Sequence, residues 1–407
     1  MPKLIINGGK SLFGEVAIGG SKNAALPILF STIITKGTSI IKNVPDIGDT
    51  RVALQLLSNM GALVSREGNT VTVDTRELVY CDPSEELVSK IRASTYLLGA
   101  SLARFGKAAI GRYGGCNFAK RPIDMHIKAA LSLGARLDSD TICVDRLVGS
   151  LITFEKCSVG ATINAVIMAV VAEGKTVIRS YAKEPHVTAL IDFLLSAGAD
   201  ISVTDDEIRI NGRELHGGNT TVIGDMIEAG TYLAAGLITD GCVRVTGIEV
   251  DTLSSFITVL SELGASIEVS GCSISASRLE NPRSVRVVAA PHPEFPTDLQ
   301  PIIAPLLARF SGGEIFDTVW ESRFGYLSEL SKFGLDYNLS DCVAIIKPSD
   351  FNPANVIAPD LRGGAAVILA ALAAKGKSTV SSIETVQRGY ENIEEKLRSL
   401  GADVYLV

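Results

Sequence analysis

The sequence predicts an α/β protein of two domains, each made of three repeated units in the order β-α-β-α-β-β. A helix that ends in glycine and is followed by an alternating apolar strand occurs six times, every 64 to 73 residues. A glycine that opens a mostly β-branched strand also occurs six times, and the two kinds of glycine alternate. Such recurrence indicates a repeated structural unit. The helix-ending glycines are Gly61, Gly134, Gly198, Gly264, Gly334 and Gly401.

One helix in several of these units is expected to be almost wholly apolar. The segments 23–32, 158–172 and 361–374 lack the polar face of a surface helix, and helices of this kind are buried. Their apolar runs, 161–172 and 363–374, are too short to span a bilayer. The helices are therefore expected inside each domain and the sheets outside. One long α/β domain with coincidental glycines is the alternative, and the strict alternation of the markers argues against it.

The first domain is predicted to span residues 21–228. The second is predicted to be discontinuous, joining residues 1–20 to residues 229–407, because the N-terminal segment precedes the first full unit and can pair with a C-terminal strand at 402–407. The chain then crosses twice between the domains. A cleft between domains is a usual place for a ligand, so the active site is expected there.

Composition and charge exclude several classes of function. The 407 residues are 46% hydrophobic, which favours sizeable cores, and the net charge of −7 argues against non-specific binding to nucleic acid. The seven cysteines are odd in number and form no C-x-x-C pair, so neither a disulfide framework nor a metal site is expected. The N-terminus has no secretory pattern. We expect a cytoplasmic monomer with no cofactor and no membrane or nucleic-acid partner.

The loop at 112–126 combines a glycine hinge with reactive and charged side chains. Two glycines precede Cys116, and Lys120 and Arg121 follow it. Glycine hinges allow a loop to move, and nearby positive charge favours the thiolate of a cysteine. A surface turn with an incidental cysteine is the alternative. The crowding of these residue types, which ends in an acid and His126, favours a mobile functional loop.

Two helix starts in the first domain carry cations. Ser21 and Lys22 join a strand to a buried helix, and backbone N–H groups at a helix start suit a phosphate or carboxylate. Alternatively, Ser21 only caps the helix and Lys22 is solvated. Arg92 opens an apolar helix, which indicates either a cation facing a cleft or a salt-bridged side chain.

The second domain carries a carboxylate and, at places that correspond between units, three isolated arginines. The proline-rich segment 291–298 fixes Asp298 before a helix, where it serves either as a general base or as an N-cap. Arg323, Arg362 and Arg388 each follow a strand and precede a helix. Guanidinium groups bind phosphate and carboxylate in bidentate fashion, so these arginines indicate an anion site; surface salt bridges are the alternative. The residues alone predict a small substrate with several negative charges.

These motifs together resemble the enolpyruvyl transferase family, in its branch of UDP-N-acetylglucosamine 1-carboxyvinyltransferases. The family fold, two inside-out α/β barrel domains of three repeated units each, agrees with the six units. The shikimate-pathway relatives match less well, because 121–125 and 158–160 resemble the nucleotide-binding sequence of the UDP-sugar branch. The resemblance covers nearly the whole chain and rests on the segments 21–27, 92–94, 114–116, 121–126, 158–162, 291–298, 360–362 and 388–391.

The resemblance implies transfer of the enolpyruvyl group of phosphoenolpyruvate to the 3-hydroxyl of UDP-N-acetylglucosamine, with release of phosphate, in peptidoglycan synthesis. Those two small molecules are the implied partners. The implied catalytic residues are Cys116 as proton donor, Asp298 as base, Lys22 and Arg388, and fosfomycin would alkylate Cys116. The implied substrate-binding residues are Lys22, Asn23, Arg92, Arg121, Pro122, Ile123, Asp124, Met125, Lys156, Cys157, Ser158, Val159, Gly160, Asp298, Val319, Arg323, Asp360, Arg362 and Arg388.

A few positions depart from the usual sequence of the family. Met226 stands where an arginine is common, residues 385–387 replace a usual His-Ile-Asp, and Gly48 and Ser322 also differ. Two alternatives therefore stay open. One is a paralogous enolpyruvyl transferase that acts on another uridine nucleotide, and the other is a catalytically silent homologue that binds UDP-sugars.

Overall fold

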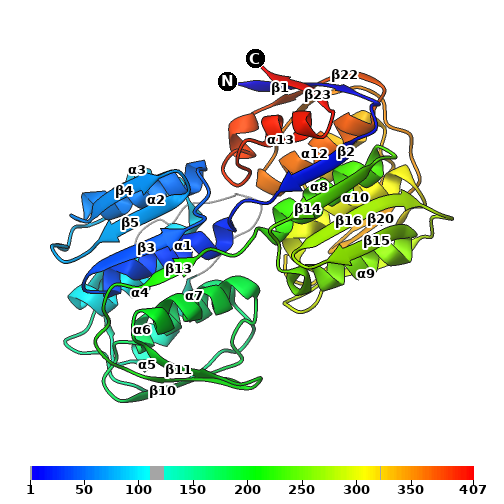
Figure 1. Ribbon diagram of the computed structural model, residues 1–407. Helices are drawn as coiled ribbons and strands as arrows, with labels where there is room; N and C mark the ends of the chain where they lie inside the picture. The colour runs from blue at the N-terminus through cyan, green and yellow to red at the C-terminus, as the bar shows by residue number, and fades with distance from the viewer. Residues whose placement is uncertain (1, 111–122, 321) are drawn as a thin grey trace. The chain divides into compact units, whose positions relative to one another are not determined.

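The computed structural model describes residues 2–110, 123–320 and 322–407, and it divides into two compact lobes (Figure 1). In the described residues, the first lobe comprises 20–110 and 123–223, and the second comprises 2–19 and 224–407. The division falls after Gly19 and after Ile223. The predicted domain boundaries near residues 20 and 228 stay a prediction.

The described strands form six sheets, three in each lobe. The sheets of the first lobe contain β13 (Asn219–Thr221), β3 (Thr38–Lys42), β5 (Thr70–Asp74) and β4 (Leu63–Glu67); β6 (Lys107–Ala109), β8 (Thr141–Cys143) and β7 (Arg136–Asp138); and β11 (Asp200–Val203), β12 (Glu207–Asn211), β10 (Lys175–Arg179) and β9 (Leu151–Thr153). The sheets of the second lobe contain β15 (Ala265–Ser270), β16 (Ser273–Leu279), β14 (Cys242–Thr246) and β2 (Phe13–Ala17); β17 (Val285–Ala289), β18 (Gly313–Asp317), β20 (Val343–Ile346) and β19 (Tyr337–Ser340); and β21 (Asn355–Ile357), β22 (Gly376–Ser381), β1 (Lys3–Gly8) and β23 (Asp403–Leu406).

The helices lie inside each lobe and the sheets outside, as predicted. The buried helices are α1 (Lys22–Ser31), α4 (Tyr96–Phe105) and α6 (Val159–Ala169) in the first lobe, and α8 (Met226–Ile238), α10 (Gln300–Arg309) and α12 (Leu361–Ala373) in the second. In the second lobe, these three helices contact one another pairwise, and Figure 1 shows them between the sheets. Their all-round apolar composition suits this central position. No helix in the described ranges has the length and apolar character needed to cross a membrane.

The remaining helices are shorter or amphipathic and connect the strands of each unit. The α-helices among them are α2 (Gly48–Asn59), α3 (Glu85–Val88), α5 (Asp124–Ser132), α7 (Pro185–Ser196), α9 (Ser254–Leu263), α11 (Leu327–Leu330) and α13 (Ile393–Ser399). The 3-10 helices are η1 (Thr32–Ile34), η2 (Arg92–Thr95), η3 (Val250–Leu253), η4 (Thr297–Leu299), η5 (Ser331–Phe333) and η6 (Ile383–Thr385).

The unit from β17 to β20 shows the predicted β-α-β-α-β-β plan in full. β17 runs parallel to β18, and the buried helix α10 makes the crossover between them. After α11, the antiparallel hairpin of β19 and β20 completes the sheet through β18. A parallel pair needs such a crossover and a hairpin does not, which explains why α10 crosses between β17 and β18.

The N-terminal segment supplies strands to two sheets of the second lobe. β1 pairs antiparallel with both β22 and β23, which confirms the predicted pairing with the C-terminal strand; Figure 1 shows both termini there. β2 runs parallel to β14. In the first lobe, β13 likewise runs parallel to β3 across a long sequence separation. Two units thus take their first strand from a distant part of the chain.

The helix-ending glycines were correctly predicted. All six have φ between 93° and 109°, a left-handed conformation that glycine adopts without a steric penalty from Cβ. The strand-opening glycines are less uniform. Gly241 has no positive φ, but a Cβ there would overlap the carbonyl oxygen of Leu12, so the requirement at this position is space.

Candidate active site

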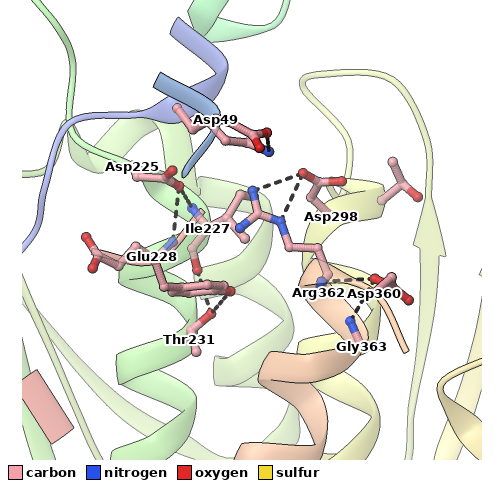
Figure 2. Close-up of polar contacts among 12 residues, drawn as sticks. Asp49, Asp225, Ile227, Glu228, Thr231, Asp298, Asp360, Arg362 and Gly363 are labelled. Atoms are coloured by element: carbon pink, nitrogen blue, oxygen red, sulfur yellow. Dashed lines mark hydrogen bonds and ion pairs between the residues drawn. The ribbon is translucent and has the colours of Figure 1, made fainter. Parts of the chain in front are cut away.

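Two aspartates cap buried helices at the site end of the second lobe. The Oδ1 atom of Asp225 accepts the N–H groups of Ile227 and Glu228 at 2.8 and 3.1 Å, at the start of α8. The Oδ1 atom of Asp360 accepts the N–H groups of Arg362 and Gly363, both at 3.0 Å, at the start of α12 (Figure 2). Each carboxylate satisfies helix donors that lack an intrahelical partner. These caps fix the first turns that carry the site residues.

Asp298 lies between two arginine side chains rather than capping α10. Its Oδ1 is 2.6 Å from Nη2 of Arg323. Its Oδ2 accepts from Nε and Nη2 of Arg362, both at 3.2 Å (Figure 2). No side-chain cap is present at the start of η4 or of α10, so the N-cap alternative was wrong. The structure therefore places two of the three predicted arginines on the predicted base.

The guanidinium groups are buried while the carboxylate is accessible. The exposed fraction of the side chain is 5% for Arg323 and 2% for Arg362, against 28% for Asp298. Burial acts to lower the pKa of Arg362, but Asp298, Tyr390 and Asp225 together outweigh it and the pKa is raised. Two fixed, positively charged guanidinium groups thus hold a carboxylate that a ligand can reach. Two positive charges favour the ionised carboxylate, which is the form that accepts a proton.

A chain of hydrogen bonds fixes Arg323 from behind. Nη1 of Arg323 donates to Oγ1 of Thr297 at 3.1 Å, and Thr297 donates to Oδ2 of Asp317 at 2.6 Å. The other oxygen of Asp317 accepts the N–H groups of Val319 and Trp320, both at 2.9 Å. Asp317 is fully buried. Asp317 therefore links Val319, one of the implied substrate-binding residues, to the side chains that hold Asp298.

Tyr390 supports Arg362 from the other side. The guanidinium carbon of Arg362 lies 5.5 Å from the centre of the Tyr390 ring, within the range of a cation–π contact. The Tyr390 hydroxyl and Oγ1 of Thr231 are 2.8 Å apart. Burial raises the pKa of Tyr390, so this hydroxyl stays protonated. Arg388, two residues earlier, is half-buried between η6 and α13.

In the first lobe, the predicted lysine makes an ion pair. Nζ of Lys22, the first residue of α1, lies 3.1 Å from Oδ2 of Asp49 in the first turn of α2. The exposed fractions of the two side chains are 13% and 4%. Asn23 follows in α1 and is half-buried. Ser21 occupies the N-cap position but makes no side-chain cap bond, so the capping alternative was wrong there too.

Three helix starts of the first lobe carry residues of the implied substrate-binding set. Arg92 opens η2, as predicted, and is half-buried. Asp124 is exposed in the first turn of α5. Ser158 is the N-cap of α6, and its side chain accepts the N–H of Ala161 at 3.4 Å. The flanking residues of the predicted set are Ile123, Met125, Val159 and Gly160, which are half-buried, and Lys156 and Cys157, which are exposed.

Some predicted residues lie outside the described ranges. These are Cys116, Arg121 and Pro122, together with the glycine hinge and Lys120. Within the described ranges, no group of three or more His, Cys, Asp and Glu side chains is placed to hold a metal ion.

Three contributing residues were missed by the sequence reasoning. Asp49 and Asp317 were not singled out, although each is a buried acid next to a strand or helix end. Asn164, in the middle of α6, was also missed because it looks like a polar interruption of an apolar run. The sequence did offer one signal for them, which is a charged or amide side chain inside an otherwise apolar element. Such a group is buried only when it has polar partners, so it indicates a hydrogen-bonded contact.

His126 predicts a pH dependence of stability. It is 5% exposed, and burial, with a smaller contribution from Arg92, lowers its pKa from 6.5 to about 4. Between these pH values the unfolded chain binds a proton that the folded protein does not. The free energy of unfolding is therefore expected to fall by about 3 kcal/mol from this group as the pH drops from 6.5 to 4. Urea unfolding of the wild type and His126→Asn at several pH values isolates this contribution; a pH-independent difference would contradict it.

The fold and these contacts define a class of protein, and comparisons identify it. The family model of EPSP synthase (3-phosphoshikimate 1-carboxyvinyltransferase) matches residues 6–397. The structure of EPSP synthase from Acinetobacter baumannii has a TM-score of 0.75 at 19% identity, with all of both chains covered, and so shares the fold. The chain belongs to this family of carboxyvinyl, or enolpyruvyl, transferases.

Within the family, the relatives point to one branch. The chain is 43% identical to UDP-N-acetylglucosamine 1-carboxyvinyltransferase 2 of Clostridium acetobutylicum, over 99% of each chain. The enolpyruvyl transferase NikO from Streptomyces tendae has a TM-score of 0.91 at 29% identity, covering 100% of this chain and 99% of its own. These likenesses confirm the predicted family and its inside-out α/β fold.

Proposed function

We propose that the protein transfers the enolpyruvyl group of phosphoenolpyruvate to the 3-hydroxyl of UDP-N-acetylglucosamine, the first committed step of peptidoglycan synthesis. The sugar oxygen bonds to C2 of phosphoenolpyruvate while C3 gains a proton. Loss of a proton from C3 and of phosphate from C2 then restores the double bond. The observation that carries the proposal is the 43% identity over 99% of both chains to a relative of that name.

The geometry supports specific roles for the described residues. Asp298, accessible and held by two buried guanidiniums, is assigned as the base that takes the proton of the sugar hydroxyl. Arg323 and Arg362 were predicted to help hold phosphoenolpyruvate; their contacts with Asp298 support a role in orienting the base. Lys22 and Arg388 are assigned to phosphoenolpyruvate, whose charges suit fixed cations.

The residues outside the described ranges keep the roles that the resemblance gives them. Cys116 is assigned as proton donor to C3, and Arg121 and Pro122 are assigned to the substrates. The uridine nucleotide is assigned to the segments around Asp124 and Ser158, with Asn23, Arg92, Val319 and Asp360 completing the set. The proposal needs no cofactor. It keeps a cytoplasmic monomer as a prediction, and the net charge of −7 supports the absence of a nucleic-acid partner.

Phosphate release tests the proposal. Purified protein is incubated with phosphoenolpyruvate and UDP-N-acetylglucosamine, with each substrate omitted in turn. Release that requires both substrates, with loss of turnover in Cys116→Ala, is the expected result. Release only with another uridine nucleotide would instead support the paralogous transferase, which the TM-score of 0.91 to NikO keeps as a second candidate. Binding of the UDP-sugar without any release would support the silent homologue.

Asp49 is predicted to orient Lys22 for phosphoenolpyruvate. In Asp49→Asn the ammonium loses a nearly buried carboxylate 3.1 Å away, and the lysine gains rotational freedom. We expect kcat/KM for phosphoenolpyruvate to fall about tenfold, because misplacing a binding group loses transition-state contacts. Steady-state kinetics at saturating UDP-sugar measures it. Asp46→Asn is the matched control, since Asp46 pairs with Arg51 at the surface; equal or faster turnover in Asp49→Asn would contradict the role.

A further inference from the structure

A buried amide joins two central helices of the first lobe. Oδ1 of Asn164 in α6 accepts the N–H of Gly99 in α4 at 2.7 Å, and Nδ2 donates to the carbonyl of Thr95 at 3.2 Å. Gly99 and Thr95 are four residues apart and bound the first turn of α4, so the amide bonds to both ends of that turn. Asn164 is fully buried. The amide therefore sets where α4 begins, at Tyr96, directly after η2.

The same amide holds the ring of His126. Nδ2 of Asn164 lies 2.8 Å from Nδ1 of His126. Because Oδ1 of Asn164 accepts the N–H of Gly99, the nitrogen must be the donor and Nδ1 of His126 the acceptor. The imidazole is thereby fixed as the neutral tautomer with its proton on Nε2. Its helix, α5, begins two residues earlier at Asp124.

The ring also packs tightly against the start of α6. A Cβ placed on Gly160 would lie 2.8 Å from Cε1 and 3.0 Å from Nε2 of His126, closer than carbon atoms normally approach. Nδ2 of Asn164 is 3.3 Å from the Gly160 carbonyl oxygen. Asp124 and Ser158 stand at the first turns of α5 and α6, so the imidazole and the amide set the spacing of these two turns.

From this placement we propose that His126 and Asn164 are positioning residues for a nucleotide site. They hold three helix starts in register: that of η2 with Arg92, that of α5 with Asp124, and that of α6 with Ser158. The ligand class is the uridine diphosphate part of a nucleotide sugar. The starts of α5 and α6 offer it backbone N–H groups and a carboxylate or hydroxyl acceptor, and η2 offers the guanidinium of Arg92. The inference rests on the proposed function and adds the residues that organise its nucleotide site. Neither residue touches the reacting atoms in this assignment.

The alternative is that the pair only stabilises the core. A core role predicts lower stability with unchanged affinity for the nucleotide. A positioning role predicts weaker nucleotide binding, with kcat and the KM for phosphoenolpyruvate at saturating UDP-sugar unchanged. The two are separated by measuring affinity and stability on the same variants.

His126→Asn and His126→Leu form the matched pair of variants. The Oδ1 atom of asparagine reaches the place of Nδ1 and still accepts from Asn164, whereas leucine leaves the amide without that acceptor. Asn164→Leu removes the other partner. Thr162→Val is the control in the same helix: it removes a buried hydrogen bond, from Ala182 N–H to Thr162 Oγ1 at 3.0 Å, that lies outside the pair. If the leucine variants do not fold, His126→Gln replaces His126→Leu. The amide of glutamine reaches the place of Nε2 and so leaves Asn164 without its acceptor at the place of Nδ1.

The experiment measures calorimetric binding of UDP-N-acetylglucosamine and of UDP, followed by kinetics. We expect dissociation constants for both ligands to rise about tenfold or more in His126→Leu and Asn164→Leu, the effect of losing one buried hydrogen bond. His126→Asn is expected to stay within about threefold of the wild type, since it keeps that bond, and Thr162→Val is expected to bind as the wild type does.

Several outcomes would overturn the inference. Unchanged affinity in both leucine variants, or an equal loss in Thr162→Val, would reduce the pair to core packing. A loss of affinity for UDP-N-acetylglucosamine but not for UDP would mean that the pair positions the sugar and not the uridine diphosphate. The wild-type protein tests the proposed function separately. If it turns over both substrates and the variants bind the nucleotide as tightly as it does, only this inference is wrong. If it binds neither UDP-N-acetylglucosamine nor UDP, both the inference and the proposed function are wrong.

Discussion

Asp298→Asn is expected to lower kcat by about 10²- to 10⁴-fold, the usual contribution of a general base. Asparagine keeps the size of the side chain, but its one accepting oxygen can replace only one of the two carboxylate oxygens that Arg323 and Arg362 bind. Its amide also does not take a proton. The loss is expected in kcat and kcat/KM alike, because proton transfer belongs to the transition state. Phosphate release under saturating substrates measures it.

The interpretation requires that the variant stay folded. Arg323 and Arg362 are buried, with 5% and 2% of their side chains exposed, and removing the partner of buried charges destabilises by about 3–5 kcal/mol. Circular dichroism and urea unfolding check the fold at the assay temperature. Asp240→Asn serves as control in the same lobe, because Asp240 pairs with Arg309 at the surface. A folded Asp298→Asn enzyme within tenfold of the wild-type kcat would exclude the assignment as base.

The repeated fold was predictable because its signals are local. Each helix-ending glycine indicates a residue with a left-handed backbone, which is a property of that residue alone, and all six have a positive φ. All-round apolar helices such as α6 and α12 report burial in the same local way. The long-range exchange of strands was only partly predictable. Pairing of β1 with β23 was inferred, whereas the parallel pairing of β13 with β3 depends on a partner far away in sequence.

The site was predictable in composition but not in connectivity. The sequence places Arg323 and Arg362 at matching places, each after a strand and before a helix, and places Asp298 before another helix. This indicates that they share one end of a domain. The sequence does not show that both guanidiniums bind the same carboxylate, because this depends on side-chain directions in two helices and a turn. For the same reason Asn164 was overlooked: its partners, Gly99 and His126, come from two other segments.

Lys396→Met is expected to lower the free energy of unfolding by about 3–5 kcal/mol, because it leaves a buried charge without its partner. Nζ of Lys396 in α13 lies 2.7 Å from Oε1 of Glu228 in the first turn of α8. The exposed fractions of their side chains are 20% and 4%. The other oxygen of Glu228 accepts the N–H of Gly19 at 2.8 Å. The pair therefore ties the N-terminal segment and α13 to the central helix, and urea unfolding at neutral pH measures its loss.

A second substitution and the pH separate the buried charge from lost packing. Glu228→Gln keeps an acceptor for Gly19 and removes the charge, so the double variant with Lys396→Met is expected to recover most of the stability. Burial raises the pKa of Glu228 even with Lys396 present, so the folded protein binds a proton at a higher pH than the unfolded chain does. The loss of unfolding free energy in Lys396→Met, relative to the wild type, must then become smaller as the pH falls through that raised pKa. Protonation of Glu228 removes the unpaired charge. A deficit that is constant with pH and unrelieved in the double variant would mean that the lysine stem stabilises the protein by packing alone.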